Sequence, residues 1–141
     1  MDLAKLSGAA GVHVGQDDLP PAEARALLGP DAVIGYSTHS VAQIAAALQQ
    51  PISYVAVGPV FGTRTKDTGY EAVGLDLVRA ARAAAGATPV VAIGGITLDR
   101  AQDVLDAGAT SVAVISDLLA GGDPAARVAS YNRLATGRSG G

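Results

Sequence analysis

The sequence has no cysteine, no tryptophan and only one phenylalanine. Without cysteine, the chain forms neither disulfides nor thiolate metal sites. Aromatic residues make up 4% of the chain and hydrophobic residues 49%, so the core must be built from Val, Ile, Leu and Ala. A core of such aliphatic side chains is typical of interleaved strands and helices.

The chain also lacks a block of basic residues and a long apolar run. Its formal net charge of −3 argues against nucleic acid as a partner. Every apolar run is far shorter than the roughly 20 residues of a membrane helix. The N-terminal stretch MDLAKLSGAAG has no apolar segment of the secretory type. These absences predict a soluble, cytoplasmic protein with no membrane partner.

Strand-like apolar runs alternate with alanine-rich helical patterns from end to end. The predicted strands cover residues 11–15, 32–36, 54–60, 89–93 and 111–115, and the predicted helices cover 20–28, 41–50, 75–85, 98–107 and 123–134. Ser40 and Thr97 directly precede two of the helices, as N-cap residues do. We therefore expect one domain over residues 1–135 and a disordered tail at 136–141.

Five strand–helix units fit two α/β architectures. One is an open, doubly wound parallel sheet, and the other is part of a (βα)8 TIM barrel. The pattern by itself favours the open sheet, because a full barrel typically needs about 250 residues. Both architectures bind ligands at the carboxyl ends of their strands, so polar residues at those ends are candidate site residues.

The stretch Tyr54–Lys66, YVAVGPVFGTRTK, is the strongest candidate. An apolar strand opens here into a loop that carries Thr63, Arg64, Thr65 and Lys66. Hydroxyl groups beside a lysine suit an anion such as phosphate. The alternative is an ordinary solvated loop after a core strand.

Two later strand ends offer backbone amides. Gly94-Gly95 follow the fourth predicted strand, where a ligand can approach the backbone at a helix start, and Ile115-Ser116 end the fifth. The loops after the last two strands of a TIM barrel form its standard phosphate site. A tight turn would explain the glycine pair alone. Two such strand ends together with the TRTK loop favour phosphate binding.

Polar side chains also follow the first two predicted strands. Asp17 and Asp18 suit Mg²⁺, or else complement the dipole of the helix that follows. His13 alternates with two valines, which favours a packed, hydrogen-bonded histidine over a catalytic one. Ser37 and His39 suit an oxyanion contact and proton transfer, or else turn and capping chemistry.

The ordered motifs GVHVGQDD, GYSTHS, YVAVGPVFGTRTK, VVAIGGI and VAVISDL resemble those of the thiamine-phosphate synthase family, from about Leu3 to Leu134. The resemblance implies a TIM barrel truncated here to about strands 4–8. It also implies Mg²⁺-dependent coupling of 4-amino-2-methyl-5-hydroxymethylpyrimidine diphosphate to 4-methyl-5-(2-phosphoethyl)thiazole, or its carboxylated precursor, with release of pyrophosphate. That reaction needs no nucleophilic side chain, and the sequence offers no evident nucleophile–base pair.

The resemblance further implies a role for each matching residue. Asp18 resembles one of two carboxylates that hold Mg²⁺ against the diphosphate. Ser37 and Lys66 resemble catalytic groups at the pyrimidine diphosphate, Ser37 by contacting it and Lys66 by neutralising its charge. Thr63 and Thr65 resemble a pair that contacts the thiazole substrate and its phosphate. The amide cradle for that phosphate corresponds to Gly94, Gly95, Ile115 and Ser116.

The motifs begin in the middle of the family's pattern. The first three strand–helix units, with a Q-x-R-x-K segment that recognises the pyrimidine and the second Mg²⁺ carboxylate, are expected upstream. Met1 stands where the family commonly has valine in N-D-R-V-D-L-A, which suggests a GTG codon read as a start. A truncated barrel leaves two sheet edges unpaired, so we expect marginal stability or self-association.

Two other functions are compatible with the same residues. One is a thiazole tautomerase, a related barrel with a similar serine–histidine segment in which His39 would transfer the proton. That relative departs from the pattern seen here at residues 63–66. The other is an inactive half-barrel that keeps the binding site for thiazole phosphate without turnover.

Overall fold

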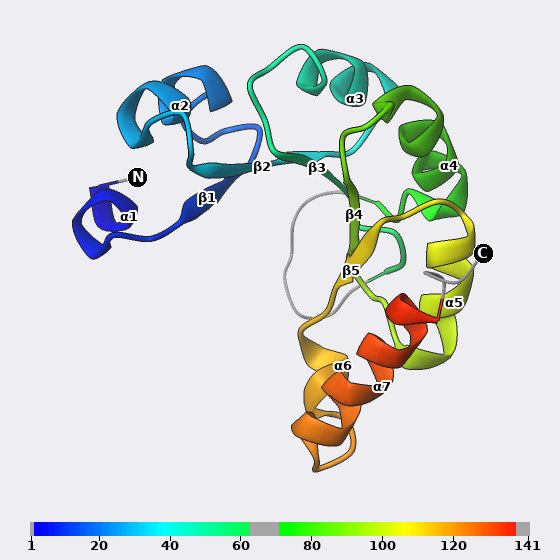
Figure 1. Cartoon of the computed structure of the whole chain (residues 1–141). Coiled ribbons are helices and arrows are strands. Elements are labelled where there is room, and N and C mark those ends of the chain that lie inside the picture. Colours follow the sequence, from blue (N-terminus) through cyan, green and yellow to red (C-terminus); the bar gives the residue numbers. More distant parts are fainter. Residues whose placement is uncertain (1, 63–70, 138–141) are drawn as a thin grey trace.

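The computed structural model describes residues 2–62 and 71–137. Five parallel strands pair in chain order: β1 (Gly11–Val14), β2 (Val33–Thr38), β3 (Tyr54–Val57), β4 (Val90–Ile93) and β5 (Ser111–Ala113). At least one helix joins each strand to the next, so all five strands point the same way. The sheet is curved into an arc (Figure 1).

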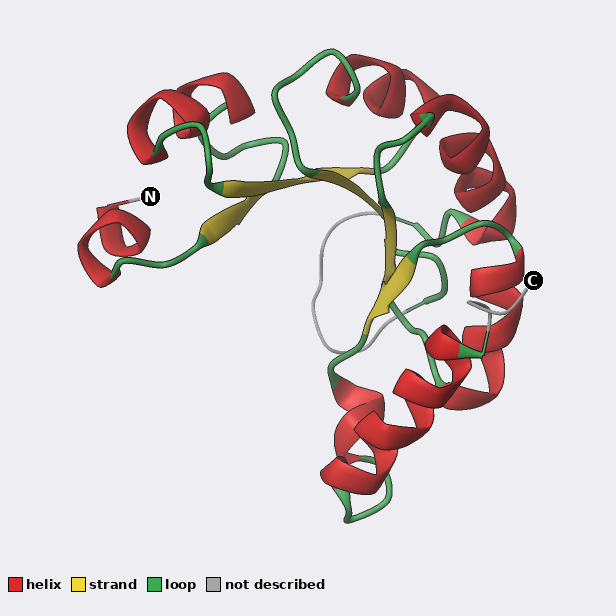
Figure 2. Ribbon diagram, in the orientation of Figure 1, coloured by secondary structure: helices red, strands yellow, loops and turns green. Residues whose placement is uncertain are grey.

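The helices are α1 (Asp2–Ser7), α2 (Pro21–Leu28), α3 (Val41–Ala47), α4 (Gly74–Ala85), α5 (Leu98–Asp106), α6 (Ser116–Leu119) and α7 (Pro124–Thr136). Helices α2 to α5 form a single layer on the convex side of the sheet (Figure 2). A doubly wound sheet would carry helices on both faces. The open doubly wound architecture favoured by the pattern is therefore wrong, and the one-sided arc is that of a barrel segment.

All five predicted strands and all five predicted helices are present, with small shifts at their ends. The N-cap prediction is confirmed for Ser40, whose Oγ accepts from the Gln43 N–H at 3.2 Å. Thr97 occupies the other N-cap position, but its side chain makes no capping bond. Two helices were not predicted, α1 in the N-terminal stretch and α6 directly after the last strand.

The core lies between the sheet and the outer helices. Strand β4 shows this through its alternation, because Val90 and Ala92 are buried whereas Val91 and Ile93 are only half-buried. Val78 of α4 and other aliphatic side chains of the outer layer pack in the same cluster as Val90 and Ala92. The aliphatic core expected from the composition is thus found on the convex side.

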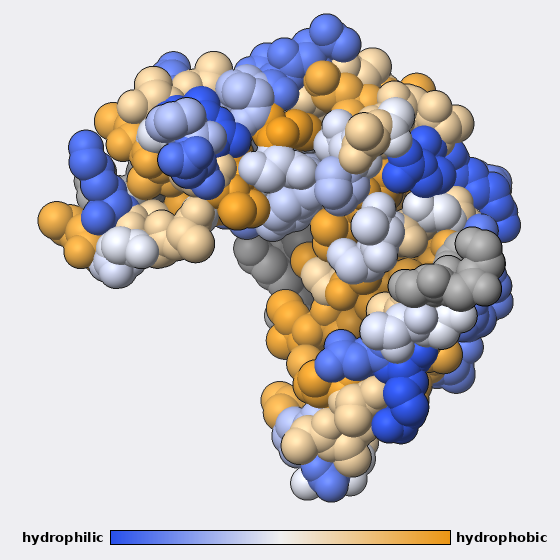
Figure 3. All heavy atoms as spheres, in the orientation of Figure 1, coloured by the Kyte–Doolittle hydropathy of each residue, from blue (hydrophilic) through white to orange (hydrophobic). Residues whose placement is uncertain are grey.

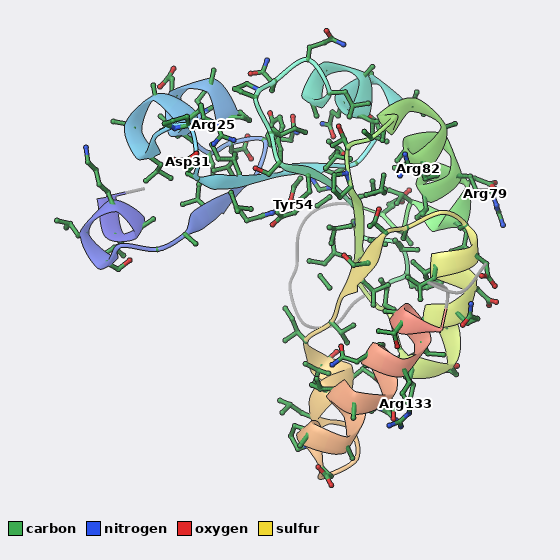
Figure 4. The ribbon with its side chains drawn as sticks, in the orientation of Figure 1. Arg25, Asp31, Tyr54, Arg79, Arg82 and Arg133 are labelled. Atoms are coloured by element: carbon green, nitrogen blue, oxygen red, sulfur yellow. The ribbon has the colours of Figure 1, made fainter. Side chains whose placement is uncertain are left out.

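The amino-terminal end of the sheet is held by Arg25 of α2. Its guanidinium donates to the backbone carbonyls of Pro30 at 2.8 Å and Pro51 at 3.1 Å, and also to that of Ala32. These carbonyls belong to the segments that lead into β2 and β3 (Figure 4). This end of the barrel segment therefore serves stability, which leaves the carboxyl ends of the strands for function.

The carboxyl end of β5 is held by Asp117, which is only 6% exposed. Its Oδ2 accepts from the Tyr131 hydroxyl at 2.6 Å, and its Oδ1 accepts from Arg127 Nη2 at 2.9 Å. The same Oδ2 accepts from the backbone N–H of Leu98 at 3.1 Å. This cluster joins the starts of α5 and α6 to α7, and the carboxylate finds the charged and polar partners that a buried charge needs.

Two edges of the sheet, on β1 and β5, have no strand partner among the described residues. Apolar side chains lie exposed next to the β5 edge, where Ile115 is 64% and Leu119 is 71% exposed. Figure 3 shows hydrophobic residues along the inner side of the arc beside β5 and α6. In the described ranges no helix is long and apolar enough to cross a membrane.

Acid should weaken the Asp117 cluster. Burial raises the pKa of Asp117, but the donors Tyr131, Arg127 and Leu98 outweigh burial and hold that pKa below its ordinary value of 3.8. A depressed pKa adds stability that is complete above the unfolded pKa and is lost as the pH falls through the folded pKa. Tyr131→Phe should therefore cost about 1.5–3 kcal/mol of unfolding free energy at pH 7. The cost should shrink below the ordinary carboxylate pKa.

Urea unfolding of both proteins over a series of pH values measures that difference. Tyr36→Phe, which removes a tyrosine hydroxyl from a half-buried residue of β2, is the matched control. A cost for Tyr131→Phe that stays constant from neutral to strongly acidic pH would contradict the assignment.

Candidate functional site

A pocket of about 260 Å³ is built from the carboxyl ends of the strands and the segments that follow them. Parallel pairing brings these ends to one rim, which is why residues far apart in sequence meet there. The pocket contains five of the residues predicted from sequence: Ser37, Gly94, Gly95, Ile115 and Ser116. His13 and His39 also line it.

His13, Gly35 and Tyr54 form one row across β1, β2 and β3, since each is the register partner of the next. Gly35 is needed in the middle, because a Cβ there would lie 2.1 Å from Cζ of Tyr54. The tyrosine ring thereby reaches across β2, and its hydroxyl lies 2.9 Å from His13 Nδ1. Figure 4 shows Tyr54 on the inner side of the arc.

Ser37 meets the other nitrogen of the same imidazole. His13 Nε2 lies 2.7 Å from Ser37 Oγ, and the Ser37 carbonyl accepts from Gln16 Nε2 at 2.7 Å. Burial lowers the pKa of His13, partly offset by the negative charge of Asp18. The lowered pKa favours the neutral imidazole, in which one nitrogen can accept a proton.

This contact confirms one expectation and corrects another. His13 is hydrogen-bonded as predicted, and its ring stacks on that of Tyr54 with the ring centroids 5.7 Å apart. The sequence offered no evident nucleophile–base pair, whereas Ser37 and His13 lie within hydrogen-bond distance and Tyr54 orients the base. The signal in the sequence was Gly35, because a glycine inside a strand often marks the close approach of another group.

His39 lies beyond the end of β2. Its Nδ1 is 2.6 Å from the carbonyl of Gly58, and its backbone N–H donates to Gln43 Oε1 at 2.7 Å. The carbonyl can only accept, so Nδ1 carries the proton in this bond. This geometry fixes the ring against the segment after β3 on the pocket wall.

Gly94 and Gly95 both have positive φ, 101° and 63°. A Cβ on Gly94 would lie 2.6 Å from Pro59 Cα, and one on Gly95 would lie 2.6 Å from the Gly62 carbonyl oxygen. Packing against the segment after β3 therefore requires glycine at both positions, independently of any ligand. The same turn leaves their backbone on the pocket wall.

Ile115 and Ser116 do not end a strand, because β5 stops at Ala113 and α6 begins at Ser116. The chain leaves the sheet earlier than predicted, and the side chain of Asp117 then binds Leu98 and α7. The first N–H groups of a helix have no partner within it, so this start still presents donors on the pocket wall.

Asp18 does not line the pocket. Its carboxylate is exposed, and Oδ2 accepts from the backbone N–H of Gly15 at 2.7 Å. In the described ranges no group of three or more His, Asp or Glu side chains is arranged to hold a metal ion. The predicted residues Thr63, Thr65 and Lys66 lie outside the described residues.

The described residues on either side of that loop are bonded to the pocket wall. Phe61 N–H donates to the Gly94 carbonyl at 3.0 Å, and Val73 N–H donates to the Pro59 carbonyl at 2.8 Å. Both ends of the loop are therefore held beside the strand ends that form the pocket.

Parallel strands with a one-sided helical layer and a pocket at the strand ends define an α/β chain of the TIM-barrel class. A family model described as thiamine monophosphate synthase matches residues 1–118. The chain belongs to this family.

Relatives agree with that assignment. The chain is 48% identical to a thiamine-phosphate synthase of Koribacter versatilis over 94% of this chain and 62% of the relative. It is 47% identical to that of Acidothermus cellulolyticus over 92% of this chain and 61% of the relative. The solved thiamine phosphate pyrophosphorylase of Pyrococcus furiosus superposes with a TM-score of 0.85 at 30% identity, covering 96% and 64% of the two chains. The chain thus spans about 62% of the length of the first relative.

Gly35→Ala should displace the Tyr54 ring, since the atoms it would meet are at the far end of that side chain. His13 is then less buried, because the Tyr54 ring no longer shields it from solvent. Its pKa should therefore rise toward the ordinary 6.5. NMR titration of the imidazole carbon-bound protons of His13 measures this change.

Tyr54→Phe is the control, because it removes the hydroxyl and keeps the ring over Gly35. The pKa of His13 should rise less in Tyr54→Phe than in Gly35→Ala. If the pKa of His13 is the same in Gly35→Ala and in the wild type, the row of His13, Gly35 and Tyr54 does not set the environment of this histidine.

Proposed function

We propose that this chain carries the thiazole phosphate side of a thiamine-phosphate synthase site. The observation that carries the proposal is the convergence of Ser37, Gly94-Gly95 and Ile115-Ser116 on one pocket. In the proposed reaction the bond between the pyrimidine methylene and the diphosphate breaks, and pyrophosphate leaves with the electron pair. The lone pair of the thiazole nitrogen then captures the pyrimidinylmethyl cation.

The proposed work of the protein is binding and charge neutralisation rather than nucleophilic attack. The backbone of Gly94-Gly95 and the start of α6 bind the thiazole phosphate, with Thr63 and Thr65 contacting the same substrate. Ser37 donates a hydrogen bond from its hydroxyl to the diphosphate while His13 holds that hydroxyl in place. Lys66 neutralises the charge that develops on the leaving pyrophosphate.

Asp18 fits the role of one ligand to Mg²⁺. Magnesium is commonly held by one or two carboxylates together with substrate phosphates and water. Asp18 is exposed, and the Gly15 N–H fixes the orientation of its carboxylate. When bound, Mg²⁺ would supply positive charge to the diphosphate.

The pyrimidine side of the site is proposed to come from the part of the relatives that this chain does not span. The chain covers 62% of the first relative. The proposed substrates are small phosphorylated molecules, and a cytoplasmic location suits the phosphorylated substrates of a biosynthetic enzyme. Coupling at the full rate is therefore expected from a chain that includes the remaining barrel units.

A tautomerase is the second candidate, and the position of His39 on the pocket wall favours it. Proton transfer at a thiazole would need this imidazole beside the substrate. An inactive half-barrel that only binds thiazole phosphate is the third candidate. Binding and turnover experiments separate the three.

Calorimetry of the full chain with thiazole phosphate is the first test, and binding at a single site is the expected result. Addition of the pyrimidine diphosphate and Mg²⁺ then tests for thiamine phosphate. Absence of any thiazole phosphate binding would refute the proposal. Binding with isomerisation of the carboxylated thiazole, but no coupling in a chain extended by the missing units, would favour the tautomerase.

Lys66→Ala in that extended chain should lower the coupling rate by on the order of 10²-fold, because the lysine opposes the leaving charge. Affinity for thiazole phosphate should change little. Lys5→Ala, which removes the same charge from an exposed position on α1, is the matched control. Loss of thiazole phosphate binding with an intact chemical rate would reverse the assignment of Lys66.

Self-association is proposed through the two edges of the sheet that have no strand partner among residues 2–62 and 71–137. The edge strands β1 and β5 offer backbone N–H and C=O groups, and Ile115 and Leu119 add exposed apolar surface beside β5. Light scattering across a dilution series should give a mass above that of one chain that falls on dilution. Ile115→Lys should shift this equilibrium toward the monomer. A constant monomeric mass would rule the proposal out.

A further inference from the structure

We propose that Asp117 is a positioning residue that fixes the spacing between the two backbone segments of the phosphate site. The inference rests on the proposed function, in which Gly94-Gly95 and Ile115-Ser116 bind the phosphate. Asp117 directly follows Ser116, and its Oδ2 accepts from the N–H of Leu98 at 3.1 Å. One carboxylate oxygen thus joins the segment after β4 to the segment after β5.

The start of α5 depends on this bond. Leu98 is the first residue of the helix, and Thr97 in the N-cap position makes no capping bond. The carboxylate of Asp117 accepts from the N–H of Leu98, one of the first N–H groups of α5, which have no partner within the helix. The acceptor at the start of α5 therefore belongs to the segment after β5, 19 positions further along the chain.

The carboxylate is itself fixed from behind by α7. Arg127 donates through Nε to Oδ2 at 3.1 Å and through Nη2 to Oδ1 at 2.9 Å. The Tyr131 hydroxyl donates to Oδ2 at 2.6 Å, and both Tyr131 and Asp117 are buried. A carboxylate with a donor on each oxygen has one orientation, which makes it a rigid link rather than a mobile surface charge.

Rigidity of the link matters because an anion that is bound by amides from two segments needs both segments in their binding positions at the same time. A site whose donors are already in place does not have to order them when the ligand binds. Loss of the Leu98–Asp117 link should let the two segments move independently. The effect should fall on the phosphate group of a ligand and not on its apolar part.

The test compares affinities for thiazole phosphate and for the dephosphorylated thiazole alcohol, measured by calorimetry on the full chain. The ratio of the two affinities reports the phosphate preference. Leu98→Pro removes the N–H of the link and shortens the side chain, and the helix should still start there because proline is tolerated in the first turn. The extended backbone of Thr97, with φ −115° and ψ 162°, suits the residue before a proline.

Leu98→Ala is the matched control, since it shortens the same side chain and keeps the N–H. We expect Leu98→Pro to lower the phosphate preference by on the order of tenfold to a hundredfold relative to Leu98→Ala. Tyr131→Phe should lower stability yet keep most of the preference, because the Leu98–Asp117 bond remains. Asp117→Ala should match Leu98→Pro wherever it folds.

The outcomes separate the inference from the proposed function. Equal phosphate preference in Leu98→Pro and Leu98→Ala overturns the positioning role alone. Wild-type protein that binds both thiazoles equally overturns the proposed phosphate site, and the positioning role with it. A preference that falls in Tyr131→Phe as far as in Leu98→Pro would assign the effect to general loss of stability, and would also refute the inference.

Discussion

Parallel pairing of five consecutive strands is the constraint on which the whole site depends. It brings every carboxyl end to one rim, so residues from β1 and from the segment after β5 line the same pocket. It also puts register partners on one face, and this is why His13 and Tyr54 meet across Gly35. The chemistry of the site therefore follows from strand register as much as from the loops that carry it.

Much of the fold could be predicted because it rests on local signals. Apolar runs, glycine stops and the N-cap at Ser40 are read within a few residues, and each of these signals agrees with its neighbours. The choice between an open sheet and a barrel segment was different. It depends on which face the helices cover, and the pattern of βα units leaves that face undetermined until the curvature of the sheet is known (Figure 2).

The site was only partly predictable for the same reason. Ser37 and the two amide segments were found because they sit at strand ends, where position alone is informative. The His13–Ser37 contact joins residues 24 positions apart and needs the register of β1 on β2. No local sequence pattern indicates the hydrogen-bond partners of Asp117 either. Nothing in ISDL indicates that its carboxylate caps the helix before it and binds the helix after it.

The two walls of the pocket present different kinds of polar group. On the side of β1 to β3 the polar groups are side chains, and His13 is held between Ser37 and Tyr54. On the side of β4 and β5 they are backbone groups, and their segments are held in place by packing on Pro59 and by the Asp117 carboxylate. The backbone wall is braced by α5 and α7, whereas the side-chain wall ends at β1, whose outer edge has no strand partner among the described residues. The side proposed to bind the anion is thus the part of the site that this chain can hold rigid by its own contacts.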